Sequence, residues 1–169
     1  NEIQNLLEDN KNSCKCYIAN DNSNGQIVLS GLNLDIDKFI ETLKSKKIKN
    51  IRLPVSAPFH CKLMDKATSI MRDKITNANF EKPKNAIISN VTGSETQEVE
   101  KIKDLLIKQI ESPVRWRESV IYMIKNGVTN FIEIGPGKVL SGLVKRIDKT
   151  INVNTVNKFE DLKDIKFND

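Results

Sequence analysis

The sequence of 169 residues has few of the side chains that most often bind metal ions. It contains a single histidine, His60, and three cysteines, Cys14, Cys16 and Cys61. No pair of these cysteines has the spacing of a zinc knuckle, and there is no second histidine to complete a zinc site. We therefore expect no metal site and three reduced thiols, as in a cytoplasmic protein.

Long apolar runs are also absent. No stretch approaches the roughly 20 residues that span a bilayer, and residues 1–12 have a polar helix pattern with Ile3, Leu6 and Leu7 rather than the pattern of a signal peptide. With 38% hydrophobic and 29% charged residues, the chain is typical of a soluble globular protein with one core. We expect no membrane partner and a chain that begins inside a structural element.

Arginine is scarce, at five of the 27 basic residues, and acidic residues are interspersed with basic ones along the chain. The net charge of +5 is therefore weak support for an acidic partner. A nucleic-acid binder built on a small sheet should carry aromatic residues on its strands for base stacking, and Tyr17 is the single candidate. We predict no nucleic-acid partner.

Strand and helix patterns alternate along the chain, which predicts the α/β fold class. In the first third, strands are predicted at residues 16–19, 26–30 and 48–53, with a turn at 20–25 and a helix at 34–46. This order, preceded by the end of a helix, matches a ferredoxin-like βαββαβ unit without its first strand. Residues 1–54 are predicted to form an incomplete ferredoxin-like small subdomain.

Residues 55–169 are predicted to form the C-terminal part of a layered α/β core. Two prolines break the pattern between residues 54 and 59, and a helix with one apolar face is expected from Cys61 onward. The other predicted elements are strands at 86–91, 129–134 and 152–156, and helices at 99–110, 114–124 and 139–147.

Four segments in order resemble the malonyl-CoA:acyl-carrier-protein transacylases and the related acyltransferase domains of polyketide and fatty-acid synthases. These segments are VSAPFHCKLM at 55–64, NDNSNGQIVLSG at 20–31, QIESPVRW at 109–116 and EIGPGKVL at 133–140. One such segment alone is weak, but four in order are specific. The resemblance implies the C-terminal part of a hydrolase-like layered α/β acyltransferase core.

The resemblance implies that malonyl passes from coenzyme A to an active-site serine and then to the phosphopantetheine thiol of acyl carrier protein. Family members carry that serine on a G-H-S-x-G elbow. The sequence contains no such elbow, no G-Q-G loop and no matching malonyl-binding arginine after an elbow. We expect the missing N-terminal part of the enzyme to supply them, and this chain alone to be inactive.

His60 matches the family's catalytic histidine. A serine hydroxyl needs a base with a pKa near ~6.5, and the same imidazole can return the proton to the leaving thiolate. The resemblance also implies that the main-chain carbonyl of Gln109 orients the ring, as aspartate does in Ser-His-Asp triads. A histidine that merely begins a helix, and a Gln109 that is an ordinary late-helix residue, are the competing interpretations.

Four further residues are candidates for substrate binding. Phe59 would narrow the acyl pocket, and in related synthase domains phenylalanine at this place accompanies malonyl. Asn20, Asn22 and Asn90 resemble polar residues that face the active-site cleft, although turn chemistry also explains asparagines. A coenzyme A thioester is the expected substrate, and no cofactor is expected.

Three features have alternative functional interpretations. The turn Gly135-Pro136-Gly137 could cradle a phosphate, although it lacks the length and the Lys-Ser/Thr ending of a Walker loop. Cys61 could be a nucleophile, although side chains at adjacent helix positions diverge. Five basic residues could contact the acidic carrier protein or the phosphates of coenzyme A, or could form a solvated surface: Arg115, Arg117, Lys138, Lys145 and Arg146.

The sequence thus predicts an acyltransferase chain of fatty-acid synthesis that provides the histidine of a Ser-His mechanism. Its expected partners are malonyl-CoA, acyl carrier protein and the missing N-terminal part. The alternative is a non-catalytic or split-gene remnant that binds carrier protein or a partner chain without turnover. Such a chain would expose apolar surface that the missing part normally covers.

Overall fold

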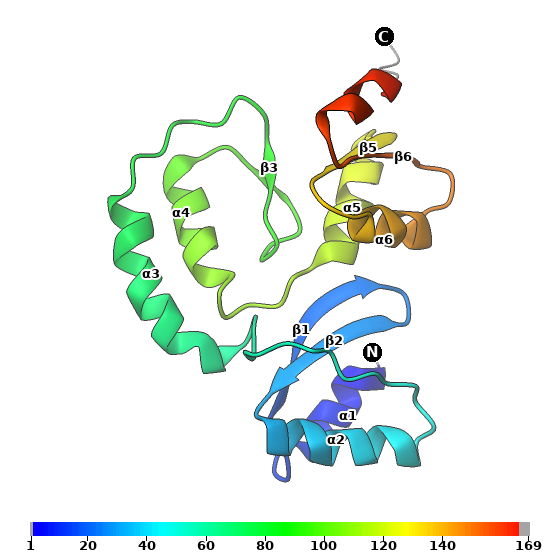
Figure 1. Ribbon diagram of the computed structural model, residues 1–169. Helices are drawn as coiled ribbons and strands as arrows, with labels where there is room; N and C mark the ends of the chain where they lie inside the picture. Colours follow the sequence, from blue (N-terminus) through cyan, green and yellow to red (C-terminus); the bar gives the residue numbers. More distant parts are fainter. Residues whose placement is uncertain (1, 166–169) are drawn as a thin grey trace.

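A computed structural model describes residues 2–165, so Asn1 and residues 166–169 of the predicted second domain lie outside the described residues. The chain is a mixed α/β structure (Figure 1). None of its described helices combines the length and apolar character needed to cross a membrane.

The first region packs two helices against a hairpin. α1 (Glu2–Asn10) precedes the antiparallel pair β1 (Cys16–Ser23) and β2 (Gln26–Gly31), and α2 (Asn33–Ser45) follows. Cys14, Phe39 and Leu43 are the buried centre of this region. β1 runs four residues beyond the predicted strand end at residue 19, because irregular pairing lets the ladder continue through residues predicted as a turn.

The predicted strand at residues 48–53 is wrong. The structure assigns no strand there, and residues 51–56 are all exposed. A strand exists only when a neighbouring strand accepts and donates its backbone hydrogen bonds, and within residues 2–165 no strand pairs with this segment. Arg52 instead contacts Asp37 and donates a 2.8 Å hydrogen bond to Asn33 Oδ1, both on α2.

The second region begins with the short helix η1 (Lys62–Met64) and α3 (Asp65–Asn77), so the predicted helix starts later than Cys61. The small antiparallel hairpin β3 (Ile87–Ile88) and β4 (Glu95–Thr96) replaces the longer predicted strand at 86–91. α4 (Val99–Lys108) packs against α3, and in Figure 1 the two helices run alongside each other.

The last part is a parallel pair of strands covered by helices. β5 (Asn130–Ile134) pairs in parallel with β6 (Asn152–Val156), and α5 (Trp116–Lys125) and α6 (Val139–Ile147) pack beside them. The 3₁₀ helix η2 (Phe159–Asp164) follows β6. The buried side chains are Val120, Val144 and Ile151.

The predicted helix 114–124 begins only at Trp116, because Val114 is engaged in a parallel bridge to Asn20. The Val114 N–H donates to the Ala19 carbonyl at 2.8 Å, and the Asp21 N–H donates to the Val114 carbonyl at 2.9 Å. This bridge fixes the chain that follows α4 to the edge of β1.

Candidate active site

His60 lies in the loop between α2 and η1. Its backbone has a conformation that residues other than glycine seldom adopt. Its φ is +60°, in the left-handed region. Such a conformation costs about 1–2 kcal/mol and persists only where the surroundings enforce it. The Ser30 hydroxyl at the end of β2 donates a 2.6 Å hydrogen bond to the Phe59 carbonyl, and the Cys61 thiol donates to the Pro58 carbonyl at 3.2 Å.

The imidazole of His60 is oriented by the end of α4. Nδ1 lies 3.0 Å from the main-chain oxygen of Gln109. Gln109 caps α4, so its carbonyl is one of the terminal acceptors that have no partner within the helix. Because a carbonyl only accepts, Nδ1 carries the proton, and the neutral ring presents an unprotonated Nε2. In the described part of the chain no protein group bonds to Nε2.

The Gln109 side chain has a separate partner. Its Oε1 lies 3.4 Å from Asn90 Nδ2, a long hydrogen bond, and the Asn90 carbonyl accepts from the Arg115 N–H at 3.0 Å. The structure therefore brings together three of the predicted site residues, His60, Gln109 and Asn90. Asn90 follows β3, which places the hairpin turn beside the end of α4.

Asn20 and Asn22 lie on β1, where Asn20 forms the bridge to Val114 five residues after Gln109. Among the described residues no hydrogen bond joins either asparagine side chain to His60. Phe59 precedes His60 directly and is 48% exposed, so its ring does not fill a core.

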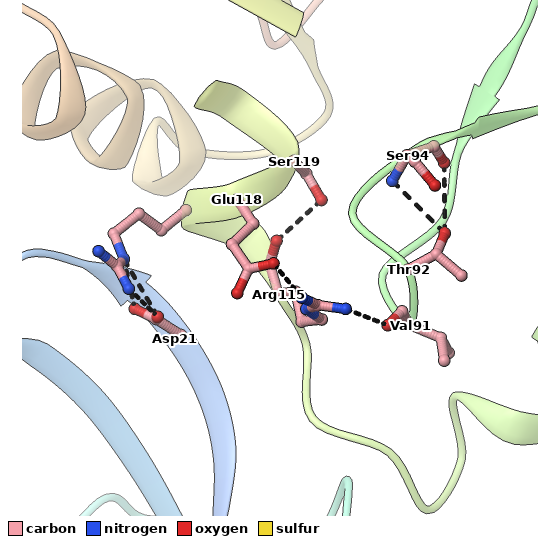
Figure 2. A network of polar contacts seen from close by, with 8 residues as sticks. Asp21, Val91, Thr92, Ser94, Arg115, Glu118 and Ser119 are labelled. Carbon is pink, nitrogen blue, oxygen red and sulfur yellow. Dashed lines mark hydrogen bonds and ion pairs between the residues drawn. The ribbon is translucent and has the colours of Figure 1, made fainter. Parts of the chain in front are cut away.

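The start of α5 carries a polar network that sequence reasoning missed (Figure 2). Arg115 contacts Glu118 and donates to the Val91 carbonyl in the β3–β4 turn, while Ser119 Oγ donates to the Arg115 carbonyl at 2.8 Å. This network ties α5 to the turn that carries Asn90.

The second missed contact joins α5 to β1. Arg117 donates through Nε and Nη2 to the two carboxylate oxygens of Asp21, at 3.0 and 2.6 Å, and through Nη1 to Asn24. The Asp21 hydrogen bond raises the pKa of Arg117. The two residues are 96 positions apart, so no local pattern could pair them.

The structure argues against two alternative interpretations of the sequence, a nucleophilic Cys61 and a phosphate site at residues 135–137. Cys61 is 2% exposed, and burial raises the pKa of its thiol, so it stays protonated. At the Gly135-Pro136-Gly137 turn, the N–H groups of Leu140 and Ser141 at the start of α6 donate to the Glu133 carboxylate at 3.1 and 2.7 Å. The chain's own carboxylate therefore occupies the place that a phosphate would need.

Of the five basic residues singled out by sequence, Arg115 and Arg117 are paired with acidic groups. Arg146 contacts Gln26, and Lys145 donates to the Lys149 carbonyl at 3.3 Å. Within residues 2–165, no cluster of histidine, cysteine, aspartate and glutamate has the arrangement needed to hold a metal ion.

Residues 5–160, which include His60 and Gln109, match the model of the acyl transferase domain. The chain belongs to this family. It is 39% identical over 152 residues to a malonyl CoA-acyl carrier protein transacylase of Staphylococcus aureus, covering 89% of this chain and 49% of the relative. The chain spans about half the length of the curated relatives it matches.

Solved structures agree. An acyl-carrier-protein-S-malonyltransferase from Bartonella henselae superposes with a TM-score of 0.91 at 38% identity, over 96% of this chain and 52% of that one. A structure described as a type II polyketide acyl-carrier protein in complex with its malonyl-transacylase superposes with a TM-score of 0.90 at 33% identity, over 96% and 53%.

Proposed function

We propose that the chain provides the histidine half of an acyltransferase that moves malonyl from coenzyme A to the phosphopantetheine thiol of acyl carrier protein, in cytoplasmic fatty-acid synthesis. The observation that carries this proposal is the hydrogen bond from His60 Nδ1 to the Gln109 carbonyl, which leaves Nε2 free to act as a base. The names of the relatives supply the substrate class.

In the proposed first half-reaction, Nε2 of His60 takes the proton of a serine hydroxyl while that oxygen attacks the malonyl thioester carbonyl. The C–S bond breaks, and the imidazolium gives its proton to the leaving coenzyme A thiolate. In the second half-reaction His60 takes the proton of the carrier thiol, whose sulfur attacks the acyl-serine. The ester C–O bond breaks, and the imidazolium returns its proton to the serine oxygen. No metal or prosthetic group takes part.

The Gln109 carbonyl stabilises the imidazolium less than a carboxylate would, which suits transfer from a reactive thioester. We assign Phe59 to the wall of the acyl pocket, and Asn20, Asn22 and Asn90 to the cleft that holds the thioester. The exposed Phe59 ring and the contact of Asn90 with Gln109 support this assignment.

The serine must come from the part of the family fold that lies outside this chain. An uncovered face of the β5–β6 pair supports the proposal that another part of the fold packs there. Parallel sheets are normally covered on both faces, yet β5 and β6 have α5 and α6 on one side, while Ile132 and Ile134 of β5 are exposed, Ile134 by 78%. We propose that the complete core is hydrolase-like, with the small subdomain ending at residue 54.

The test is transfer of radiolabelled malonyl from malonyl-CoA to acyl carrier protein. The purified chain should show no transfer, and the chain coexpressed with the complementary part of a relative should show it. Label on the purified chain above background would contradict the two-part mechanism. A folded two-part complex without transfer would end the proposal.

The second candidate is a remnant that binds carrier protein or a partner chain without turnover. The absence of a G-H-S-x-G segment from the sequence favours it. A folded two-part complex that transfers no malonyl, together with retention of carrier protein by the chain in a pull-down, would favour the remnant, whereas malonyl transfer by that complex would exclude it. Lys145 and Arg146, on α6, are the basic residues to test for that contact.

A further inference from the structure

The peptide group between Phe59 and His60 controls how the His60 backbone is turned. Because this group is planar, the position of the Phe59 carbonyl fixes the orientation of the whole peptide plane. The φ of His60 is the rotation about the bond that joins this plane to the His60 Cα atom. A hydrogen bond to the Phe59 carbonyl therefore acts directly on the dihedral angle that the structure holds at +60°.

The Ser30 hydroxyl makes that hydrogen bond, at 2.6 Å. Within residues 2–165, no backbone N–H donates to the same carbonyl. Ser30 is placed by the β1–β2 hairpin, where it pairs with Tyr17, and not by the loop that it contacts. The next residue, Gly31, lies so close to β1 that a Cβ atom there would be 3.0 Å from the Lys15 carbonyl oxygen. The donor thus comes from a tightly paired strand end.

His60 is held from two sides by elements far apart in the sequence. The peptide plane before it is held from β2, and its ring is held from α4 through the Gln109 carbonyl, 3.0 Å from Nδ1. A residue other than glycine that is released from the left-handed region returns to negative φ, which swings its Cβ atom and side chain. The free-energy cost of the left-handed conformation is comparable to the net contribution of one hydrogen bond. Loss of the Ser30 bond is therefore sufficient to shift this balance.

We infer that Ser30 is a positioning residue for the imidazole of His60. Its hydroxyl fixes the peptide plane that precedes His60 and so keeps Nδ1 at the Gln109 carbonyl and Nε2 unprotonated. The inference deepens the proposed function and rests on it in one respect, the use of this ring as a base. The Ser30 bond lies at the surface, so water can bind the Phe59 carbonyl when the hydroxyl is removed. A variant without the hydroxyl should lose the orientation of the ring and keep the fold.

The test reads the ring directly, because His60 is the single histidine of the chain. The chain is labelled with ¹⁵N and prepared without a histidine tag, and the two imidazole nitrogen shifts are measured at alkaline pH, where histidine is neutral. These shifts give the ratio of the Nδ1–H to the Nε2–H tautomer. In Ser30→Ala this ratio should fall about two- to tenfold, the fold-change that corresponds to the loss of one ordinary hydrogen bond.

A matched pair of variants separates the hydroxyl from the shape of the side chain. Ser30→Thr and Ser30→Val both introduce a β-branched residue that suits a strand, and they differ from each other only in the hydroxyl. The ratio should stay within about twofold of wild type in Ser30→Thr and fall as in Ser30→Ala in Ser30→Val. Ser45→Ala is the control, because it removes a 2.8 Å serine-to-carbonyl bond within α2 and should leave the ratio unchanged.

Circular dichroism shows which variants keep the fold. A folded Ser30→Ala or Ser30→Val with the wild-type tautomer ratio would overturn the inference, and so would equal changes in Ser30→Thr and Ser30→Val. The measurement needs neither a nucleophilic serine nor malonyl-CoA, so it is independent of turnover. A folded two-part complex that transfers no malonyl would refute the proposed function and leave this inference standing, whereas an unchanged ratio would do the reverse.

Discussion

Two halves of one loop differ in how they are held, and only one of them has its backbone conformation fixed by hydrogen bonds from distant segments. Residues 57–61 are fixed by the Ser30, Cys61 and Gln109 hydrogen bonds, which enforce a left-handed conformation at His60. Residues 49–55, a few positions earlier, are held through the Arg52 side chain and expose their apolar side chains.

The contrast shows which groups this chain can position by itself. Every contact that orients His60 comes from β2, α4 or the loop itself, all of which are present. Residues 49–55 are tied to α2 through Arg52, and their apolar side chains stay exposed. The His60 ring is therefore oriented by groups of this chain, whereas the apolar side chains of residues 49–55 stay exposed.

The largest expected effect is the loss of turnover when His60 is replaced. In the coexpressed two-part enzyme, His60→Ala should lower malonyl transfer by about 10² to 10⁴, the usual contribution of a general base. Steady-state transfer to carrier protein measures it, and copurification of the variant shows that the complex still forms. A loss below tenfold with an intact complex would contradict the assigned role.

The next effect separates the Gln109 carbonyl from its side chain. Pro113→Gly loosens the chain after α4 and should displace the carbonyl, and a misplacement of about 1 Å can cost about 10²-fold. Gln109→Ala keeps the carbonyl and loses the long hydrogen bond to Asn90, so it should cost less than tenfold. Turnover of both variants, normalised to the amount of folded protein, shows which substitution lowers activity more.

If Gln109→Ala is the more damaging variant, the side chain takes part directly and the carbonyl argument fails. Asn90→Ala is the matched control, because it removes the same side-chain hydrogen bond from the other partner. A loss equal to that of Gln109→Ala would come from this hydrogen bond, and any additional loss would come from the contact with the thioester that we assign to Asn90.

The prediction from sequence succeeded where structure depends on local pattern. The helices at α2 and α4 and the strand β6 lie within a few residues of their predicted limits, because apolar periodicity and proline breaks act over short distances. The contact of His60 with the Gln109 carbonyl came from the family resemblance and is present, although its catalytic role stays a prediction.

Prediction failed where structure depends on distant residues. Residues 48–53 have a strand pattern, but their state depends on a neighbouring strand rather than on their own side chains. The Asp21–Arg117 pair and the Ser30 bond to Phe59 join segments 96 and 29 positions apart, and no periodicity signals such pairs.

The two regions can also be compared by how much one ion pair in each contributes to the free energy of unfolding. Asp21–Arg117 is partly buried and forked, so its double-mutant coupling energy should be about 1–2 kcal/mol. Arg52–Asp37, which ties residues 49–55 to α2, is half exposed at both side chains, and its coupling energy should be less than about 0.5 kcal/mol. Urea denaturation of the single and double alanine variants measures both. Equal coupling energies would remove the distinction between the two regions.

A smaller effect than that of the Asp21–Arg117 pair is expected at Glu133, whose carboxylate accepts hydrogen bonds from the start of α6. The Ser141 side chain and the N–H groups of Ser141 and Leu140 lower the pKa of Glu133. The two backbone N–H groups are donors of normal geometry, at 2.7 and 3.1 Å, whereas Ser141 Oγ makes no hydrogen bond within the described residues. A folded pKa below the unfolded value means that this stabilisation is complete above the ordinary carboxyl range, near pH ~4.3, and is lost as the pH falls through the folded pKa.

Glu133→Gln should therefore lower the free energy of unfolding by about 0.5–1 kcal/mol at neutral pH, the usual value of a charge at a helix N-terminus. The difference between wild type and variant should shrink as the solution is acidified below the folded pKa, because the protonated glutamic acid then resembles glutamine. Urea denaturation at a series of pH values measures this trend. Glu41→Gln, at an exposed ion pair on α2, is the control, with an expected change near zero at neutral pH. A Glu133 difference that is constant across the whole pH range would show that the side chain acts by packing rather than by charge.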